Sequence, residues 1–118
     1  MVNNQPLNGV RVLDLTNIIM GPFATQLLGD LGADIIKVES PEGDLMRDVG
    51  ISKSEKMSSV FLGTNRNKRS IVLNLKEKSH KQVLWKLIAK SDIFIHNMRP
   101  SKLDTLGFSY KKILKKNK

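Results

Sequence analysis

The segment Val10-Arg-Val-Leu-Asp-Leu15 decides the fold, because a short, mostly apolar run bounded by loops is typical of a buried strand. Apolar residues at helical spacing follow it, namely Phe23, Leu27, Leu28 and Leu31. Gly32 is placed to end that helix in a left-handed cap, and Asp34-Ile-Ile-Lys-Val-Glu39 reads as a second strand. A strand, a helix and a strand joined by short links predict a right-handed parallel crossover.

The same alternation continues to the end of the chain. The predicted elements are a long loop over 40–62 with a short helix near 44–49, a strand over 70–75, a helix over 78–90, a strand over 92–96, a short helix over 101–106 ended by Gly107, and a last helix capped by Ser109. This order predicts an α/β chain with a Rossmann-like parallel sheet and alternating helices. Only one glycine, Gly21, follows the first strand closely, so the dinucleotide fingerprint of three glycines is absent.

Length and composition exclude several classes of protein. The chain has 118 residues, enough for one domain with a modest core. Its apolar stretches are far shorter than a membrane span, and its first residues lack the basic start and apolar block of a signal peptide. There is no cysteine, which excludes disulfides and thiol catalysis. We therefore expect a cytoplasmic protein that does not bind membranes or carry a metal.

The net charge of +9 first suggests nucleic acid, but its distribution argues against it. Residues 111–118 hold five lysines and no acid, so the remainder carries +9 − 5 = +4. One Trp and one Tyr supply no repeated platform for stacking bases. We expect a lysine-rich tail over 111–118 attached to one folded unit over 1–110, and no nucleic-acid partner.

A group of cations lies just before the third predicted strand. The stretch Asn65-Arg-Asn-Lys-Arg-Ser-Ile-Val-Leu-Asn-Leu-Lys76 places Arg66, Lys68 and Arg69 before that strand and Lys76 after it. Cations at a boundary between strand and helix suit a phosphate-bearing ligand. The alternative is a solvated loop with no ligand.

Six ordered blocks carry a resemblance to a known family. They are Pro6 to Thr16, Gly21-Pro22, Leu28 to Glu39, Gly43-Asp44 with Arg47, Asn67 to Ile71 with Leu73 to Lys76, and Asp92 to Pro100 with Leu106-Gly107-Phe108. In these blocks the chain resembles the N-terminal segment of family III CoA-transferases. That family includes formyl-CoA and carnitine-CoA transferases and, as a relative, α-methylacyl-CoA racemase.

The resemblance implies a coenzyme A site after the first, third and fourth strands. The matching positions are Asn17, Ile18, Met20, Leu73, Lys76, Asn97, Met98 and Arg99. Two departures stand out: this chain has Asn17 where a compared relative has histidine, and Ser40 near a relative's arginine. Both remove a contact to the nucleotide.

The resemblance also implies that a downstream aspartate attacks the acyl-CoA in the transferases, and that this region lies beyond the matched blocks. We therefore expect an N-terminal fragment with no catalytic residue of its own that binds CoA or acyl-CoA. The alternative is a non-catalytic binding or assembly module that completes a separately encoded C-terminal half. Asp14 is expected to be structural, and His96 a surface or hydrogen-bonding residue. Self-association is expected through apolar surface around Leu13, Ile36, Phe94 and the Val83–Leu87 stripe.

Overall fold

The structure is a computed structural model that describes residues 5–117. Residues 1–4, at the start of the predicted folded unit over 1–110, and Lys118, at the end of the predicted tail over 111–118, lie outside the described residues. Four parallel strands form one sheet in the order β3-β2-β1-β4. The strands are β1 (Arg11–Leu15), β2 (Asp34–Glu39), β3 (Lys68–Val72) and β4 (Ile93–His96). The helices are α1 (Met20–Asp30), the 3₁₀ helix η1 (Leu45–Asp48), α2 (Ser59–Asn65), α3 (Lys78–Ile88), α4 (Pro100–Leu106) and α5 (Tyr110–Lys116).

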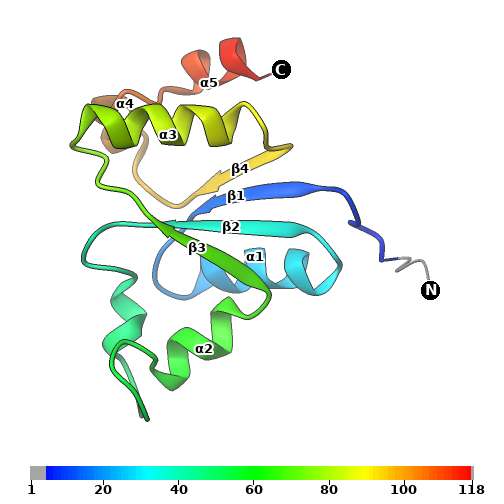
Figure 1. Cartoon of the computed structure of the whole chain (residues 1–118), viewed down its shortest axis with the longest axis vertical. Coiled ribbons are helices and arrows are strands. Elements are labelled where there is room, and N and C mark those ends of the chain that lie inside the picture. The colour runs from blue at the N-terminus through cyan, green and yellow to red at the C-terminus, as the bar shows by residue number, and fades with distance from the viewer. Residues whose placement is uncertain (1–4, 118) are drawn as a thin grey trace.

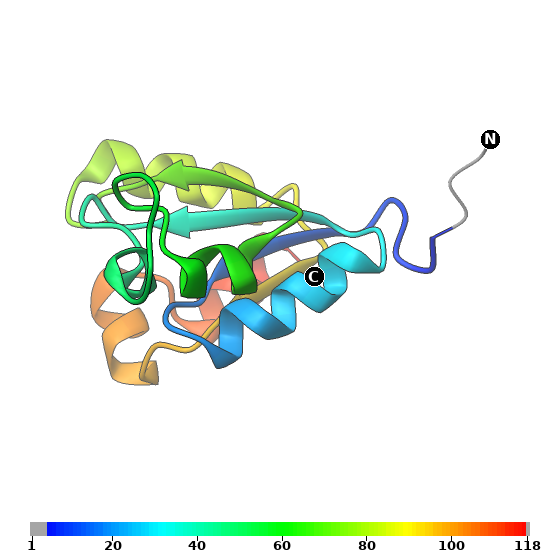
Figure 2. The same ribbon diagram turned by 90° about the horizontal axis from the view of Figure 1, so that it is seen from below.

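Helices cover both faces of this sheet (Figures 1 and 2). On one face, Leu13 and Leu15 of β1 pack with Leu84 and Ile88 of α3 in the larger core cluster, which also includes residues of α4 and α5. On the other face, the alternate strand positions pack against α1 in a smaller cluster: Val12, Ala33 and Ile35, with Leu28 and Ile95 beside them. The alternation of side chains along β1 therefore divides the core into two layers.

The strand order changes direction at β1. The chain moves from β1 outward to β2 and β3, and then returns to place β4 on the other side of β1. Val12 pairs with Ile35 of β2 and with Ile93 of β4, so β1 is central. In open α/β sheets, ligands bind at the carboxyl ends of the strands where the order reverses, which here is the gap between β1 and β4.

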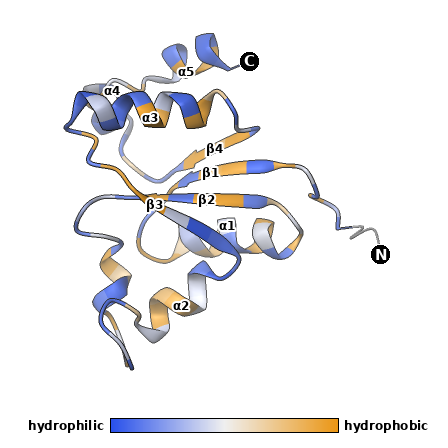
Figure 3. Ribbon diagram, in the orientation of Figure 1, coloured by the Kyte–Doolittle hydropathy of each residue, from blue (hydrophilic) through white to orange (hydrophobic). Residues whose placement is uncertain are grey.

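Most predicted elements are confirmed, including the strand Asp34–Glu39 and the left-handed Gly32, whose φ is +101°. Two predictions were wrong. Helix α2 begins inside the predicted loop over 40–62 and continues to Asn65, and β3 runs over Lys68–Val72 instead of 70–75. In Figure 3 the start of β3 is hydrophilic, whereas β1, β2 and β4 are mostly hydrophobic. Lys68, which begins β3, was assigned to the preceding loop because its buried ion-pair partner, Asp14, is distant in the sequence.

The predicted partly exposed apolar surface was wrong for Leu13, which is fully buried. Ile36, Phe94, Val83 and Leu87 are partly exposed, as expected, and pack against the larger cluster. A more exposed apolar stripe, which was not predicted, follows α1 and consists of Met20, Phe23, Leu27 and Leu31. Within residues 5–117, no helix is both long and apolar enough to cross a membrane.

Candidate functional site

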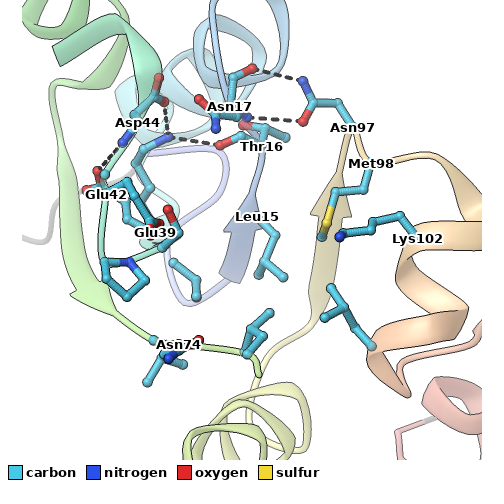
Figure 4. A pocket seen from close by; sticks show the side chains of 18 of the residues that line it. Leu15, Thr16, Asn17, Glu39, Glu42, Asp44, Asn74, Asn97, Met98 and Lys102 are labelled. Carbon is cyan, nitrogen blue, oxygen red and sulfur yellow. Dashed lines mark hydrogen bonds and ion pairs between the residues drawn. The ribbon is translucent and has the colours of Figure 1, made fainter. Parts of the chain in front are cut away.

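A pocket of about 300 Å³ lies at the carboxyl edge of the sheet (Figure 4). Every strand contributes its last residues or the loop that follows it, and α4 closes one side. The pocket is lined by Leu15, Thr16, Asn17, Lys37, Val38, Glu39, Ser40, Pro41, Glu42, Gly43, Asp44, Leu73, Asn74, Leu75, Lys76, Asn97, Met98, Lys102 and Leu106. The cavity therefore occupies the place where this topology favours a ligand.

A buried ion pair forms part of the pocket lining. Lys37 of β2 lies 2.8 Å from Asp44, and both side chains are 1% exposed. The Lys37 ammonium also donates to the backbone oxygen of Thr16 at 3.0 Å. A buried charge is tolerated when it is paired and hydrogen-bonded, so Lys37 ties the loops after β1 and β2 together and carries little free charge.

Glu39 fixes the same loop from the end of β2. Its carboxylate accepts two hydrogen bonds from Arg47 at 2.7 Å, one from Ser70 at 2.5 Å and one from the Asp44 backbone N–H at 3.0 Å. Burial alone would raise the pKa of Glu39, but these hydrogen bonds and the charge of Arg47 outweigh it and lower the pKa to about 2. The Arg47 guanidinium also lies 3.7 Å above the ring of Phe61, which anchors α2 to this corner.

The mouth of the pocket is more basic than its interior. Lys76 and Lys102 line it, and the one exposed carboxylate of the lining, Glu42, lies within the influence of Lys76. A hydrogen bond from Ser40 and, to a smaller extent, the charge of Lys76 lower the pKa of Glu42. Figure 4 shows Lys102 reaching from α4 toward Met98. Among residues 5–117, neither Lys76 nor Lys102 has a carboxylate within 4 Å, so both ammonium groups remain available to an anion.

The structure brings together five of the eight residues that the resemblance indicated: Asn17, Leu73, Lys76, Asn97 and Met98 all line the pocket. Ile18 and Met20 have exposed side chains outside the lining, and Arg99, the residue before α4, is not part of the lining either. Sequence reasoning missed Lys102. A signal was present, since Lys102 lies in the first turn of the helix that follows the fourth predicted strand.

The prediction that Arg66, Lys68 and Arg69 hold a phosphate is not supported by their placement. Because β3 begins at Lys68, these residues lie at its amino end, away from the pocket. Arg66 pairs with Asp30, Lys68 with Asp14, and Arg69 with Asp34. Lys68 is 2% exposed and also donates to the oxygens of Pro22 and Asn65, and its burial lowers its pKa despite Asp14. Lys68 therefore stabilises the fold from a buried position, whereas Arg66 and Arg69 form ion pairs at the surface.

Asp14 has the structural role that was expected of it. It is fully buried and accepts hydrogen bonds from the Thr16 N–H, the Thr16 hydroxyl, the Thr25 hydroxyl and Lys68. His96 points into the α3 side of the sheet, where its ring lies 5.8 Å from that of Phe94, and its buried Nδ1 has no partner among residues 5–117. In the same part of the chain, no group of three metal-ligating side chains is present.

The chain matches the profile described as CoA-transferase family III over residues 7–118. This chain belongs to CoA-transferase family III. It is 46% identical over 110 residues to the succinyl-CoA:glutarate CoA-transferase of Mus musculus, covering 92% of this chain and 25% of the relative. It is 43% identical over 107 residues to the formyl-CoA:oxalate CoA-transferase of Streptomyces coelicolor, covering 91% and 26%.

The fold of this family III chain is shared with solved structures. A crystal structure of a CAIB/BAIF family protein from Brucella suis matches with a TM-score of 0.90 and 38% identity, over 97% of this chain and 31% of that chain. The chain thus spans about a quarter of the length of the curated relatives it matches. The family assignment and the Rossmann-like fold expected from the sequence are both confirmed.

Proposed function

We propose that this chain forms the part of a family III CoA-transferase that holds the nucleotide end of coenzyme A. The observation that carries the proposal is the pocket at the reversal point of the sheet, with two available lysines at its mouth and apolar Leu73 and Met98 in its lining. An adenine ring needs an apolar slot, and phosphates need cations or N–H donors. A cavity of about 300 Å³ suits one end of CoA and is too small for the whole molecule.

Titration calorimetry with CoA and with 3′-phospho-ADP tests this proposal. Lys76→Ala and Lys102→Ala should each weaken binding by about fivefold, the equivalent of roughly 1 kcal/mol for one exposed charge-assisted contact. Binding should also weaken with added salt, because the Debye length falls from about 10 Å at 0.1 M to about 3 Å at 1 M.

Arg99→Ala is the matched control, since it removes the same charge from a residue outside the pocket lining. It should bind both ligands as the unmodified chain does. Equal affinity for all three variants and the parent chain would place the nucleotide elsewhere. A loss confined to Arg99→Ala would restore that residue to the site and remove the two lysines from it.

We further propose that the chain alone does not transfer CoA. Of the three carboxylates that line the pocket, Glu39 and Asp44 are held in ion pairs and only Glu42 is exposed. The resemblance places the attacking aspartate beyond the matched blocks. Incubation with succinyl-CoA and glutarate, or with formyl-CoA and oxalate, should give no transfer above the blank. Turnover that disappears when one of the chain's own aspartates is replaced would overturn this expectation.

A second candidate is an assembly module for a separately encoded C-terminal half. The exposed stripe on α1 favours it, because an exposed apolar face of this kind marks an interaction site. The occupant we propose is a polypeptide equivalent to the remaining three quarters of the relatives' length. Co-expression with that portion of a relative should give a complex that survives purification and transfers CoA. Failure of the two chains to co-purify would count against this candidate and leave CoA binding untouched.

A further inference from the structure

The side chain of Asn97 binds the backbone of one residue, Asn17, with both ends of its carboxamide. Its Oδ1 accepts from the backbone N–H of Asn17 at 3.1 Å, and its Nδ2 donates to the backbone oxygen of Asn17 at 2.8 Å. The two residues are 80 positions apart and end neighbouring strands, β4 and β1 (Figure 4). The bond therefore bridges the gap at which the strand order reverses.

The loop that Asn97 holds has an unusual backbone. Ile18 has φ +76°, in the left-handed region that a β-branched residue rarely adopts. Its N–H is held by Asn17 Oδ1 at 2.8 Å and by Asp44 Oδ1 at 3.2 Å. Asn17 Oδ1 also accepts from the N–H of Leu45 at 3.2 Å. Such a conformation persists only where the surroundings hold it, and here side chains from three loops do so.

We propose that Asn97 is a positioning residue. It fixes the backbone N–H and C=O of Asn17, and through them the turn at Ile18, so that Thr16 and Asn17 present a constant rim to the ligand. The inference rests on the proposed function, because the ligand read by that rim is the nucleotide of CoA. It also changes the role expected for Asn97, since the carboxamide that the resemblance assigned to the ligand is bound to the protein's own backbone.

Two variants separate positioning from the alternatives. Asn97→Ala removes both hydrogen bonds without adding charge. Asn97→Asp keeps an acceptor for the Asn17 N–H but places a second acceptor against the Asn17 oxygen. Below the pKa of the new carboxyl group, its O–H becomes a donor and can restore the missing bond. The nearby oxygen raises that pKa above the usual value of about 3.9. Glu39, with a pKa of about 2, stays ionised over the same range, so its hydrogen bonds with Arg47 and with the loop after β2 are unchanged.

The experiment records the backbone amide NMR signals of Asn17 and Ile18 without ligand, and then titrates 3′-phospho-ADP, from pH 7 to about pH 4.5. We expect Asn97→Ala to shift both signals and to weaken binding at least fivefold at every pH. Asn97→Asp should behave like Asn97→Ala at pH 7. As the pH falls, its amide signals and its affinity should return toward those of the unmodified chain at the same pH.

Other outcomes are decisive too. Weaker binding by Asn97→Ala with unmoved Asn17 and Ile18 signals would mean that Asn97 contacts the ligand directly. If the Asn17 and Ile18 signals move but the affinity for 3′-phospho-ADP is unchanged, the bond between Asn97 and Asn17 stabilises the fold and does not position the ligand site. If Asn97→Ala does not fold, recovery by Asn97→Asp alone decides the question. Absence of ligand binding by the unmodified chain would overturn the proposed function, and the amide signals would still test the bond between Asn97 and the loop.

Discussion

The carboxylate of Glu39 joins β2 to the segment that follows it, and its ionisation should control acid stability. Its pKa is about 2 in the folded chain, against an ordinary value of 4.5. Because the folded pKa is lowered, the stabilisation is complete above about pH 4.5 and is lost as the pH falls toward 2. The lowered pKa corresponds to a contribution from ionised Glu39 of about 3 kcal/mol to the free energy of unfolding. Glu39→Gln should lose this stability at pH 7 and show a flatter decline in acid.

Urea unfolding midpoints between pH 7 and pH 2 measure this effect. Asp34→Asn serves as the control, since hydrogen bonds from Arg11 and Arg69 outweigh its desolvation and lower the pKa of Asp34 too, but its side chain is 36% exposed. The control should lose much less stability, because exposed ion pairs contribute about 0–1 kcal/mol. Equal acid sensitivity in Glu39→Gln and the unmodified chain would show that Glu39 does not govern this range.

At the scale of elements, the end of α4 depends on one glycine. Gly107 has φ +98° and its N–H binds the Asp104 oxygen, while the N–H of Phe108 binds the Leu103 oxygen. This cap turns the chain so that Phe108 is fully buried with its ring 4.8 Å from that of Trp85. Gly107→Ala should destabilise the chain by about 1 kcal/mol, because alanine disfavours the left-handed region.

Gly63 provides the matched comparison. It lies inside helix α2, and an added methyl group would meet no atom within 4 Å at either glycine. Gly63→Ala should therefore stabilise the chain by about 0.5–1 kcal/mol, since alanine favours helix and restricts the unfolded chain. Thermal melts of the two variants should move in opposite directions. A shift in the same direction would show that backbone conformation does not explain the difference.

The elements that the sequence predicted correctly are those whose signal is local. The strand Asp34–Glu39 and the cap at Gly32 depend on neighbouring residues only. Helix α2 was missed although Ser58 precedes an apolar run and its hydroxyl caps the helix by accepting from the Phe61 N–H at 3.1 Å. The start of β3 could not be predicted, because Lys68 becomes a buried strand residue only through Asp14, 54 positions away. Lys102 and the backbone role of Asn97 likewise required the assembled sheet.

At the scale of the whole molecule, the uncovered surface lies on the α1 side. Phe23 and Leu27 are 44% and 45% exposed on one helical face. Without a partner, we expect the chain to self-associate through this face as its concentration rises. Phe23→Gln with Leu27→Gln should lower the average mass measured by light scattering toward that of a monomer.

Leu114→Gln is the control for that experiment, because Leu114 is equally exposed, at 44%, on α5. Helix α5 lies on the other side of the sheet, where Ile113 packs against the larger cluster, so Leu114→Gln should leave self-association unchanged. A chain that remains monomeric at every concentration tested would remove the α1 stripe as an interaction surface for copies of this chain.

The pairing of β4 with β1 has a consequence for how the pocket comes into being during synthesis. Val12 pairs with Ile35 first and gains its second strand neighbour only when Ile93 is available, and Asn17 gains Asn97 equally late. Contacts between residues so distant in sequence form late, because a long loop must close before they contribute. While β4 is still inside the ribosome, a nascent chain can form β1, α1, β2 and β3. The pocket rim between β1 and β4 is not yet closed at that stage. Nucleotide binding should therefore begin abruptly, at the chain length at which β4 and α4 have emerged from the ribosome. A bound nucleotide would then report that β4 has paired with β1.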